Sequence, residues 1–70
     1  MNAVSITLKA ARVNANLTQK KAAELLKISK QTLANYEMYK TIPNIETAQK
    51  IANLYGMEVD KIIFLPTDCA

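Results

Sequence analysis

The apolar residues of this chain recur mostly at intervals of three and four positions, which is the spacing of amphipathic helices. The pattern predicts a first helix that begins after Ser5 as its N-cap and runs to about Val13. Its buried stripe would consist of Leu8, Ala11 and Ala15. Asn16 is expected to end this helix, because asparagine tolerates the left-handed backbone of a sharp helix exit better than any residue except glycine.

Two further helices are predicted to follow in quick succession. Thr18 is the expected N-cap of a helix over 19–26, whose inward positions would be Ala22, Ala23, Leu25 and Leu26. Ser29 is the expected cap of the next helix, which runs from Lys30 to about Met38. Two short helices separated by so few residues, each capped by a hydroxyl side chain, indicate a helix-turn-helix arrangement.

The second half of the chain continues the helical pattern. A fourth helix is predicted over 45–55, ended by Gly56, with inward positions Ala48, Ile51, Ala52 and Tyr55. A short fifth helix is predicted over 59–64, before Pro66. Because no useful stretch alternates in the manner of a β-strand, the expected fold is all-α, with five helices in one domain over residues 1–66 and a short tail at 67–70.

Composition narrows the possible chemistry. The 70 residues leave no room for a second domain, and they contain one cysteine, Cys69, and no histidine. An internal disulfide and a cysteine-rich metal site are therefore excluded, and the commonest general base and metal ligand is missing. We expect no enzymatic activity, no metal and no cofactor.

Two further features bear on location. The longest apolar run, residues 62–65, is far shorter than the roughly 20 residues of a membrane span. The first eight residues lack the basic leader and long apolar segment of a signal peptide. The expectation from sequence is a soluble, cytoplasmic protein.

Charge is distributed unevenly along the chain. Residues 1–40 carry seven basic and two acidic side chains, a net charge of +5, whereas residues 41–70 carry two basic and four acidic ones, a net charge of −2. The first half should therefore attract a polyanion and the second half should not.

The outward face of the third helix carries the residue types that recognise DNA. Leu33 and Tyr36 are expected to point toward the core, so the opposite face presents Lys30, Gln31, Ala34, Asn35 and Met38. Glutamine and asparagine offer a donor and an acceptor side by side, which matches the major-groove edge of adenine, and lysine can contact guanine or a phosphate. A small alanine between them permits close approach and can meet a thymine methyl group.

Phosphate contacts are expected at helix ends. Thr18, Gln19 and Lys20 stand where unpaired N–H groups and the positive end of the helix dipole favour an anion. Lys40, in the loop after the third helix, is placed to reach the DNA backbone on the other side of the groove. Taken singly, each of these side chains is equally compatible with an ordinary solvated surface; the spacing of the whole set favours DNA binding.

Three segments together resemble the Cro/C1 repressor type, also called the XRE family, of helix-turn-helix domains. They are residues 8–12 (LKAAR), 17–19 (LTQ) and 28–37 (ISKQTLANYE), and the similarity continues through Pro43, 51–52, Leu54 and 56–57 to Asp60. The resemblance implies a compact five-helix domain whose third helix enters the major groove, with homodimers reading two half-sites about one helical turn apart.

The resemblance also assigns roles to individual residues. Gln19 would contact the phosphate backbone, and residues of the third helix would contact phosphates or base edges. The complete set of expected DNA contacts is Thr18, Gln19, Lys20, Ser29, Lys30, Gln31, Thr32, Ala34, Asn35 and Lys40. Arg12 and Glu37 would form a partly buried ion pair that ties the first helix to the end of the third.

The chain departs from the family pattern at three turns. Lys27 stands where the turn between the second and third helices usually has glycine, so it must take a left-handed conformation or use a different turn. Asn16 replaces the glycine after the first helix. Tyr39 stands where a small residue commonly follows the third helix, which leaves the geometry of that loop and the contact of Lys40 open.

The function expected from sequence is that of a sequence-specific DNA-binding regulator, most simply a repressor of the single-domain kind encoded by phages and mobile elements. Activation, or service as the antitoxin of a toxin pair, would use the same module. A different class is a protein-interaction adaptor that has lost DNA binding, suggested by the apolar segment 62–65. The start at Met1 favours a full gene product over an N-terminal fragment.

Overall fold

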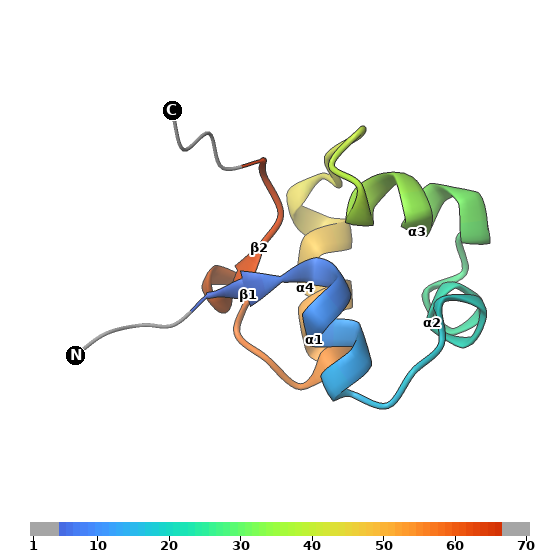
Figure 1. The fold of residues 1–70 in the computed structure, drawn as a ribbon, viewed down its shortest axis with the longest axis horizontal. Coiled ribbons are helices and arrows are strands. Elements are labelled where there is room, and N and C mark those ends of the chain that lie inside the picture. Colours follow the sequence, from blue (N-terminus) through green and yellow to red (C-terminus); the bar gives the residue numbers. More distant parts are fainter. Residues whose placement is uncertain (1–4, 67–70) are drawn as a thin grey trace.

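The computed structural model describes residues 5–66, and within them the chain forms four α-helices, one 3₁₀ helix and a pair of very short strands. The helices are α1 (Leu8–Asn14), α2 (Gln19–Leu26), α3 (Lys30–Glu37) and α4 (Ile45–Tyr55). The other elements are β1 (Ile6–Thr7), the 3₁₀ helix η1 (Val59–Lys61) and β2 (Ile62–Ile63). In Figure 1, α1 and α4 occupy the centre, with α2 and α3 to one side and the two strands to the other. The mainly helical fold and the helix-turn-helix of α2 and α3 are confirmed.

Each α-helix begins with a side-chain cap. Thr7, Thr18, Ser29 and Asn44 each accept a hydrogen bond at their side-chain oxygen from the backbone N–H three residues further on. Such caps satisfy one of the N–H groups that a helix start leaves unpaired, and each contributes roughly 0.5–2 kcal/mol. The caps predicted at Thr18 and Ser29 are confirmed.

The start of α1 differs from the prediction. Thr7, and not Ser5, is the cap, and its hydroxyl oxygen lies 3.1 Å from the backbone nitrogen of Ala10. Two β-branched residues, Ile6 and Thr7, precede the helix, and their extended backbone pairs with β2. The helix therefore cannot begin at Ser5.

The four α-helices also end alike. Asn16, Lys27, Tyr39 and Gly56 all have a left-handed backbone, with φ of 62°, 62°, 60° and 72°. At each end the next residue donates its N–H to the carbonyl five positions earlier, as Ile28 does to Ala23 at 3.0 Å. This is the Schellman arrangement, in which glycine is the usual residue. Of these four positions only one is glycine, so three side chains accept a conformation that costs roughly 1 kcal/mol or more.

The core lies between α1, α3 and α4, where Leu8, Leu33 and Ile51 are fully buried. Small residues let the helices approach closely around them, namely Ala11, Ala22, Ala23, Ala48 and Ala52. The bounds and the inward positions predicted for α4 are confirmed. Leu25, in contrast, is 49% exposed, because it lies on the flank of α2 and the buried stripe of that helix runs through Ala22, Ala23 and Leu26.

The predicted fifth helix over 59–64 is wrong. Only Val59–Lys61 are helical, in a single 3₁₀ turn, and Ile62 and Ile63 then become extended. They form a parallel pairing with β1, in which Ile62 lies opposite Ile6 and Ile63 opposite Thr7. β-Branched residues favour this extended conformation, and the pairing buries Ile62, which is 5% exposed.

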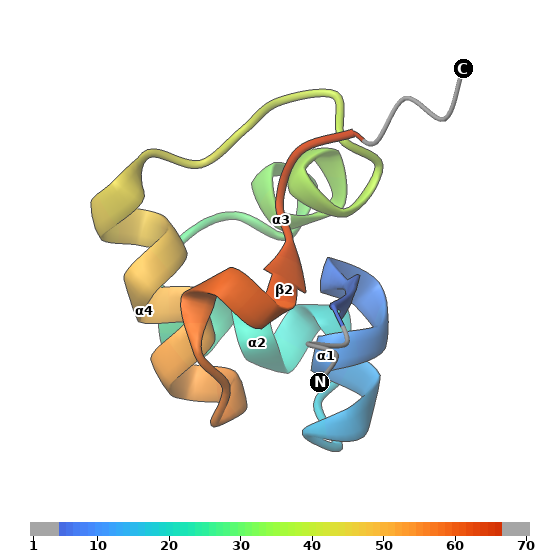
Figure 2. The ribbon, with the colours of Figure 1, turned by 90° about the vertical axis from the view of Figure 1, so that its left-hand side faces the viewer.

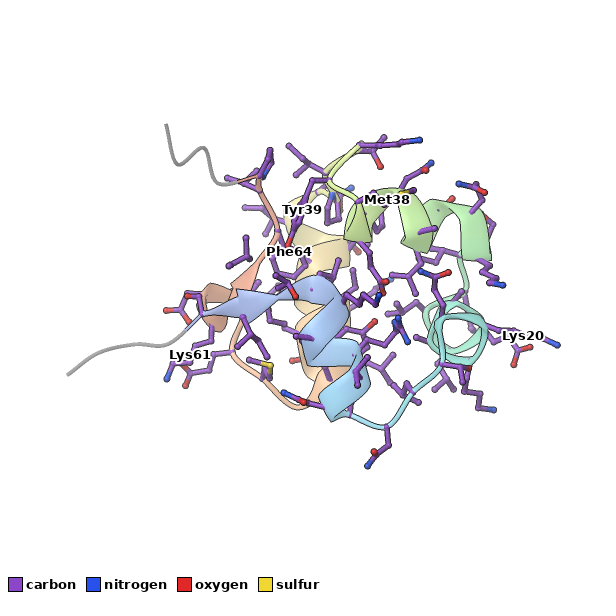
Figure 3. All side chains as sticks on the ribbon, in the orientation of Figure 1. Lys20, Met38, Tyr39, Lys61 and Phe64 are labelled. Atoms are coloured by element: carbon purple, nitrogen blue, oxygen red, sulfur yellow. The ribbon has the colours of Figure 1, made fainter. Side chains whose placement is uncertain are left out.

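Tyr39 connects the loop after α3 to this strand pair by hydrogen bonds. Its hydroxyl donates a hydrogen bond to the carbonyl oxygen of Ile63 at 2.8 Å and lies 3.4 Å from the backbone nitrogen of Leu8, which donates to it. Figure 2 shows β2 and the residues after it running up past α3, and Figure 3 labels Tyr39 in the loop after α3. Tyr39, which has a left-handed backbone, therefore extends its side chain from the loop after α3 to β2.

No helix between residues 5 and 66 is long and apolar enough to cross a membrane. The same part of the chain brings no three acidic, cysteine or histidine side chains together as a metal site. Cys69 and the tail predicted at 67–70 lie outside the described residues.

Candidate nucleic-acid interface

A buried ion pair joins α1 to the end of α3. The Nε atom of Arg12 lies 2.7 Å from the Oε2 atom of Glu37, and the two side chains are 10% and 4% exposed. Arg12 also donates from one terminal nitrogen to Oε1 of Glu37, at 3.3 Å, and from the other to the carbonyl oxygen of Leu17, at 2.8 Å. The guanidinium therefore connects α1, the turn before α2, and α3 in one network.

Gln19 extends this network to the start of α2. Its Nε2 atom donates a hydrogen bond to Oε1 of Glu37 at 3.0 Å. The adjacent cap is formed by Thr18, whose hydroxyl oxygen accepts from the backbone nitrogen of Lys21 at 3.0 Å. The N–H groups of Gln19 and Lys20, the first two of the helix, have no partner within α2 and remain available to an anion.

These elements surround an open groove of about 670 Å³ on the outer surface. Its walls come from α1, the start of α2, and α3, and its lining consists of Lys9, Arg12, Thr18, Gln19, Lys20, Lys30, Ala34, Glu37 and Met38. Since Arg12 and Glu37 neutralise one another, the three lysines leave the groove with a net positive charge. A surface of this sign, combined with a helix N-terminus, suits a phosphate backbone.

The outer face of α3 carries hydrogen-bonding side chains beside this groove. Gln31 is exposed, and its Nε2 atom donates to Oδ1 of the partly buried Asn35 at 3.0 Å. At the start of the same helix, the hydroxyl oxygens of Ser29 and Thr32 lie 2.8 Å apart, and Ser29 also accepts from the backbone nitrogen of Thr32 at 2.9 Å. The helix thus presents amides along one face and hydroxyls at its N-terminal end.

The loop after α3 presents Lys40. Its side chain is exposed, and its backbone nitrogen donates to the carbonyl oxygen of Asn35 at 2.9 Å, within the Schellman turn that Tyr39 forms. The loop therefore leaves α3 in a defined direction, despite the bulky residue at the turn.

The expected contact residues fall into two groups. The groove brings together Thr18, Gln19, Lys20, Lys30 and Ala34. The others lie outside its lining, on α3 and the loop that follows, and they are Ser29, Gln31, Thr32, Asn35 and Lys40. Figure 3 shows Lys20 projecting outward from α2, on the side of the molecule opposite Lys61. The single basic residue of η1 is thus remote from the groove.

Sequence reasoning missed Lys9, which is exposed and lines the groove from α1. The signal for it was present. Lys9 precedes Arg12 by three positions, so the two residues share one face of the first helix. Because Glu37 is the last residue of α3, the ion pair of Arg12 with Glu37 requires that this face of the first helix is oriented toward α3.

One polar atom next to the network has no partner. The hydroxyl of Tyr55, on α4, is buried without a hydrogen bond to any described residue. Burial raises the pKa of Tyr55 to about 12, with the charge of Glu37 acting in the same direction and that of Arg12 against it. The phenol is therefore neutral in the folded protein at physiological pH.

Comparison with known proteins agrees with this geometry. A family described as Helix-turn-helix matches residues 8–62, which include all four α-helices. The HTH-type transcriptional regulator ImmR of Bacillus subtilis is 43% identical over 56 residues, which cover 80% of this chain but only 44% of that protein. An uncharacterized HTH-type transcriptional regulator of Methanocaldococcus jannaschii, MJ0272, is 36% identical over 61 residues, covering 87% of this chain and 92% of that protein. No solved structure matched at a comparable level of significance.

Proposed function

The chain belongs to the helix-turn-helix family of the Cro/C1 type, and from this premise we propose that it is a transcriptional regulator that binds double-stranded DNA. In this proposal α3 enters the major groove and its outer face reads bases. Both relatives described above are named as HTH-type transcriptional regulators, which supports the same role here.

The observation that carries the proposal is the joint placement of two surfaces. The amide-bearing face of α3 lies beside a groove that carries three lysines and the N-terminus of α2. The buried Arg12–Glu37 pair fixes these helices relative to one another. Base-reading and phosphate-binding groups are therefore held in one rigid arrangement, as DNA recognition requires.

Within this proposal the contact residues divide by role. Gln19, Lys20 and Lys40, with Lys9 added by the structure, would bind phosphates, and Gln31 and Asn35 would read base edges. Regulation would follow from occupancy alone. A domain bound over a promoter would repress transcription without chemistry or a cofactor.

We further propose that the protein binds DNA as a homodimer. Two exposed apolar side chains lie between α3 and the first turn of α4, Ile42 at 53% in the connecting segment and Ile45 at 80% as the first residue of α4. A second copy of the chain would cover these two side chains.

The proposal is tested by selecting bound sequences from random duplex DNA at near-physiological salt. We expect a two-fold symmetric motif to be enriched. In follow-up titrations, Lys40→Ala should weaken binding to all sequences alike, whereas Gln31→Ala should relax the preference at a base position. Equal losses across operator variants for both substitutions would remove the proposed division between phosphate and base contacts.

Salt dependence separates DNA binding from the adaptor alternative. With Lys9, Lys20 and Lys40 proposed to bind phosphates, the logarithm of the affinity should fall with the logarithm of salt concentration at a slope of roughly −3 per protomer. An apolar contact with another protein would barely respond to salt. In the segment that suggested an adaptor, Ile62 is buried and only Leu65, at 57%, is largely exposed, so the structure gives that alternative little support.

A further inference from the structure

The side-chain pair on the outer face of α3 is a feature that the groove does not include. Gln31 and Asn35 are one helical turn apart, and the Nε2 atom of Gln31 donates to Oδ1 of Asn35 at 3.0 Å. Neither side chain lines the groove of the candidate interface. Because both project from the helix proposed to enter the major groove, the hydrogen bond between them determines which groups remain for DNA.

The hydrogen bond leaves the two amides unequal. A carboxamide has one acceptor oxygen and two N–H donors. Gln31 keeps a free oxygen and a second N–H, so it can still offer a donor and an acceptor together. The oxygen of Asn35 is turned toward Gln31 and uses one lone pair for that bond, so the groups of Asn35 with no partner within the pair are its two N–H donors.

We propose that this pair reads two neighbouring bases as one unit, with Gln31 recognising adenine and Asn35 recognising guanine. Adenine presents an acceptor and a donor in the major groove, which complements the remaining groups of Gln31. Guanine presents two acceptors, N7 and O6, which complement the two donors of Asn35. This inference rests on the proposed function and specifies the DNA sequence that it requires.

The spacing of the pair is compatible with adjacent reading. Four residues of helix advance the chain by about 6 Å, and successive base pairs are about 3.4 Å apart. The adenine and the guanine should therefore lie within two base pairs of each other. The hydrogen bond also restrains both side chains before DNA binds, which reduces the rotamer entropy lost on binding.

Because Gln31 and Asn35 are hydrogen-bonded to each other, a substitution at Gln31 should also change the base that Asn35 recognises. Without the side chain of Gln31 nothing holds the amide of Asn35 in one orientation, so Asn35 can turn and present its oxygen and an N–H together, the pair that matches adenine. Gln31→Ala should therefore abolish the adenine preference at one position and also change the neighbouring preference from guanine toward a mixture of guanine and adenine. Independent readers would show only the first effect.

Asn35→Asp provides the matched variant. The carboxylate has nearly the same shape and still accepts the hydrogen bond from Gln31, but it has no donors. An acidic side chain accepts from the N4 amino group of cytosine. We expect the guanine position to change to cytosine on the same strand, while the adenine position is retained.

The experiment measures Kd values for the selected motif and for all single-base changes at the two positions. It compares wild type, Gln31→Ala, Asn35→Asp and, as a control that should preserve both preferences, Lys40→Ala; circular dichroism confirms that each variant is folded. Each lost base contact should reduce discrimination about 5- to 100-fold. The inference is supported if Gln31→Ala alters both positions and Asn35→Asp alters one.

Other results would refute either the coupling of Gln31 with Asn35 or DNA binding itself. If wild type enriches a motif but Gln31→Ala changes a single position, the two amides read independently and the coupled reader is refuted. The same holds if the adenine preference disappears in Asn35→Asp and persists in Gln31→Ala. If folded wild type enriches no sequence at all, the proposed function itself fails.

Discussion

Tyr55→Phe removes a single buried hydroxyl from the centre of the domain. Tyr55 is 7% exposed, its ring packs in the hydrophobic core, and its oxygen has no hydrogen-bond partner among residues 5–66. A buried hydroxyl without a partner destabilises a protein by roughly 1–3 kcal/mol, because it has lost its hydrogen bonds to water. Phenylalanine preserves the ring, so we expect the variant to be more stable than wild type by about 1 kcal/mol at neutral pH.

Alkaline pH should enlarge this difference. In the unfolded chain tyrosine ionises with a pKa of about 10, whereas burial raises the pKa of Tyr55 to about 12 in the fold. Below pH 10 both states are protonated, and stability does not depend on this group. Between about pH 10 and 12 only the unfolded state loses its proton, so wild type should lose roughly 2–3 kcal/mol that the phenylalanine variant keeps.

Urea unfolding followed by circular dichroism, repeated from neutral pH to about pH 11.5, measures both effects. The difference between the two proteins isolates Tyr55, because the lysines and the remaining tyrosines, Tyr36 and Tyr39, are common to both. The reasoning is refuted if the variant is less stable than wild type at neutral pH, since the hydroxyl must then have a partner. Parallel stability curves above pH 10 would refute the burial of the phenol.

Three further substitutions test the connections described above, each by urea unfolding. Glu37→Ala leaves the buried guanidinium of Arg12 without its charge partner and should cost about 3 kcal/mol. Lys27→Gly relieves a left-handed backbone with φ of 62° and should stabilise the protein by about 0.5–1 kcal/mol. Tyr39→Phe removes the hydrogen bond to the carbonyl oxygen of Ile63 and should cost about 1 kcal/mol.

Matched variants make these three results interpretable. Glu24→Ala alters an exposed glutamate on α2 and should change stability by less than about 0.5 kcal/mol. Lys21→Gly places glycine inside the same helix and should cost about 1 kcal/mol, the opposite sign to Lys27→Gly. Tyr36→Phe should have little effect. If a control matches its test variant, the structural explanation for that position is wrong.

Local signals accounted for the helices that the sequence predicted well. The bounds of α4 followed from a regular apolar stripe and from Gly56, and the starts of α2 and α3 followed from their hydroxyl caps. These features act within one or two helical turns. A pattern confined to neighbouring residues therefore contains the information needed to find them.

The errors arose where distant segments meet. The sequence at 59–64 is compatible with a helical turn, but Ile62 and Ile63 gain a partner strand from the opposite end of the described sequence, which no local pattern reveals. Leu25 was misplaced because α2 has only eight residues, too few to define the centre of its buried stripe. Tyr39 was recognised as unusual, but its hydrogen bond to Ile63 depends on the same tertiary contact.

The sequence predicted the contact residues of α3 in the candidate interface better than those of α1. The residues of α3 were found because glutamine and asparagine at helical spacing have a direct chemical match in DNA. Lys9 was missed because its role depends on how α1 packs against α3. The hydrogen bond between Gln31 and Asn35 was also overlooked, although residues four apart on a helix are neighbours, because each side chain was considered separately.

The pairing of β1 with β2 has a consequence for the order in which the chain folds. It joins residues near the two ends of the described chain, so the four intervening helices must be compact before the pairing becomes favourable. Local helices form within about a microsecond, whereas a contact between distant segments waits for the closure of a long loop. We expect this two-residue ladder to close last and to open first. Its transient opening would also release the hydroxyl of Tyr39, so the loop after α3 would share the exchange kinetics of β1 and β2.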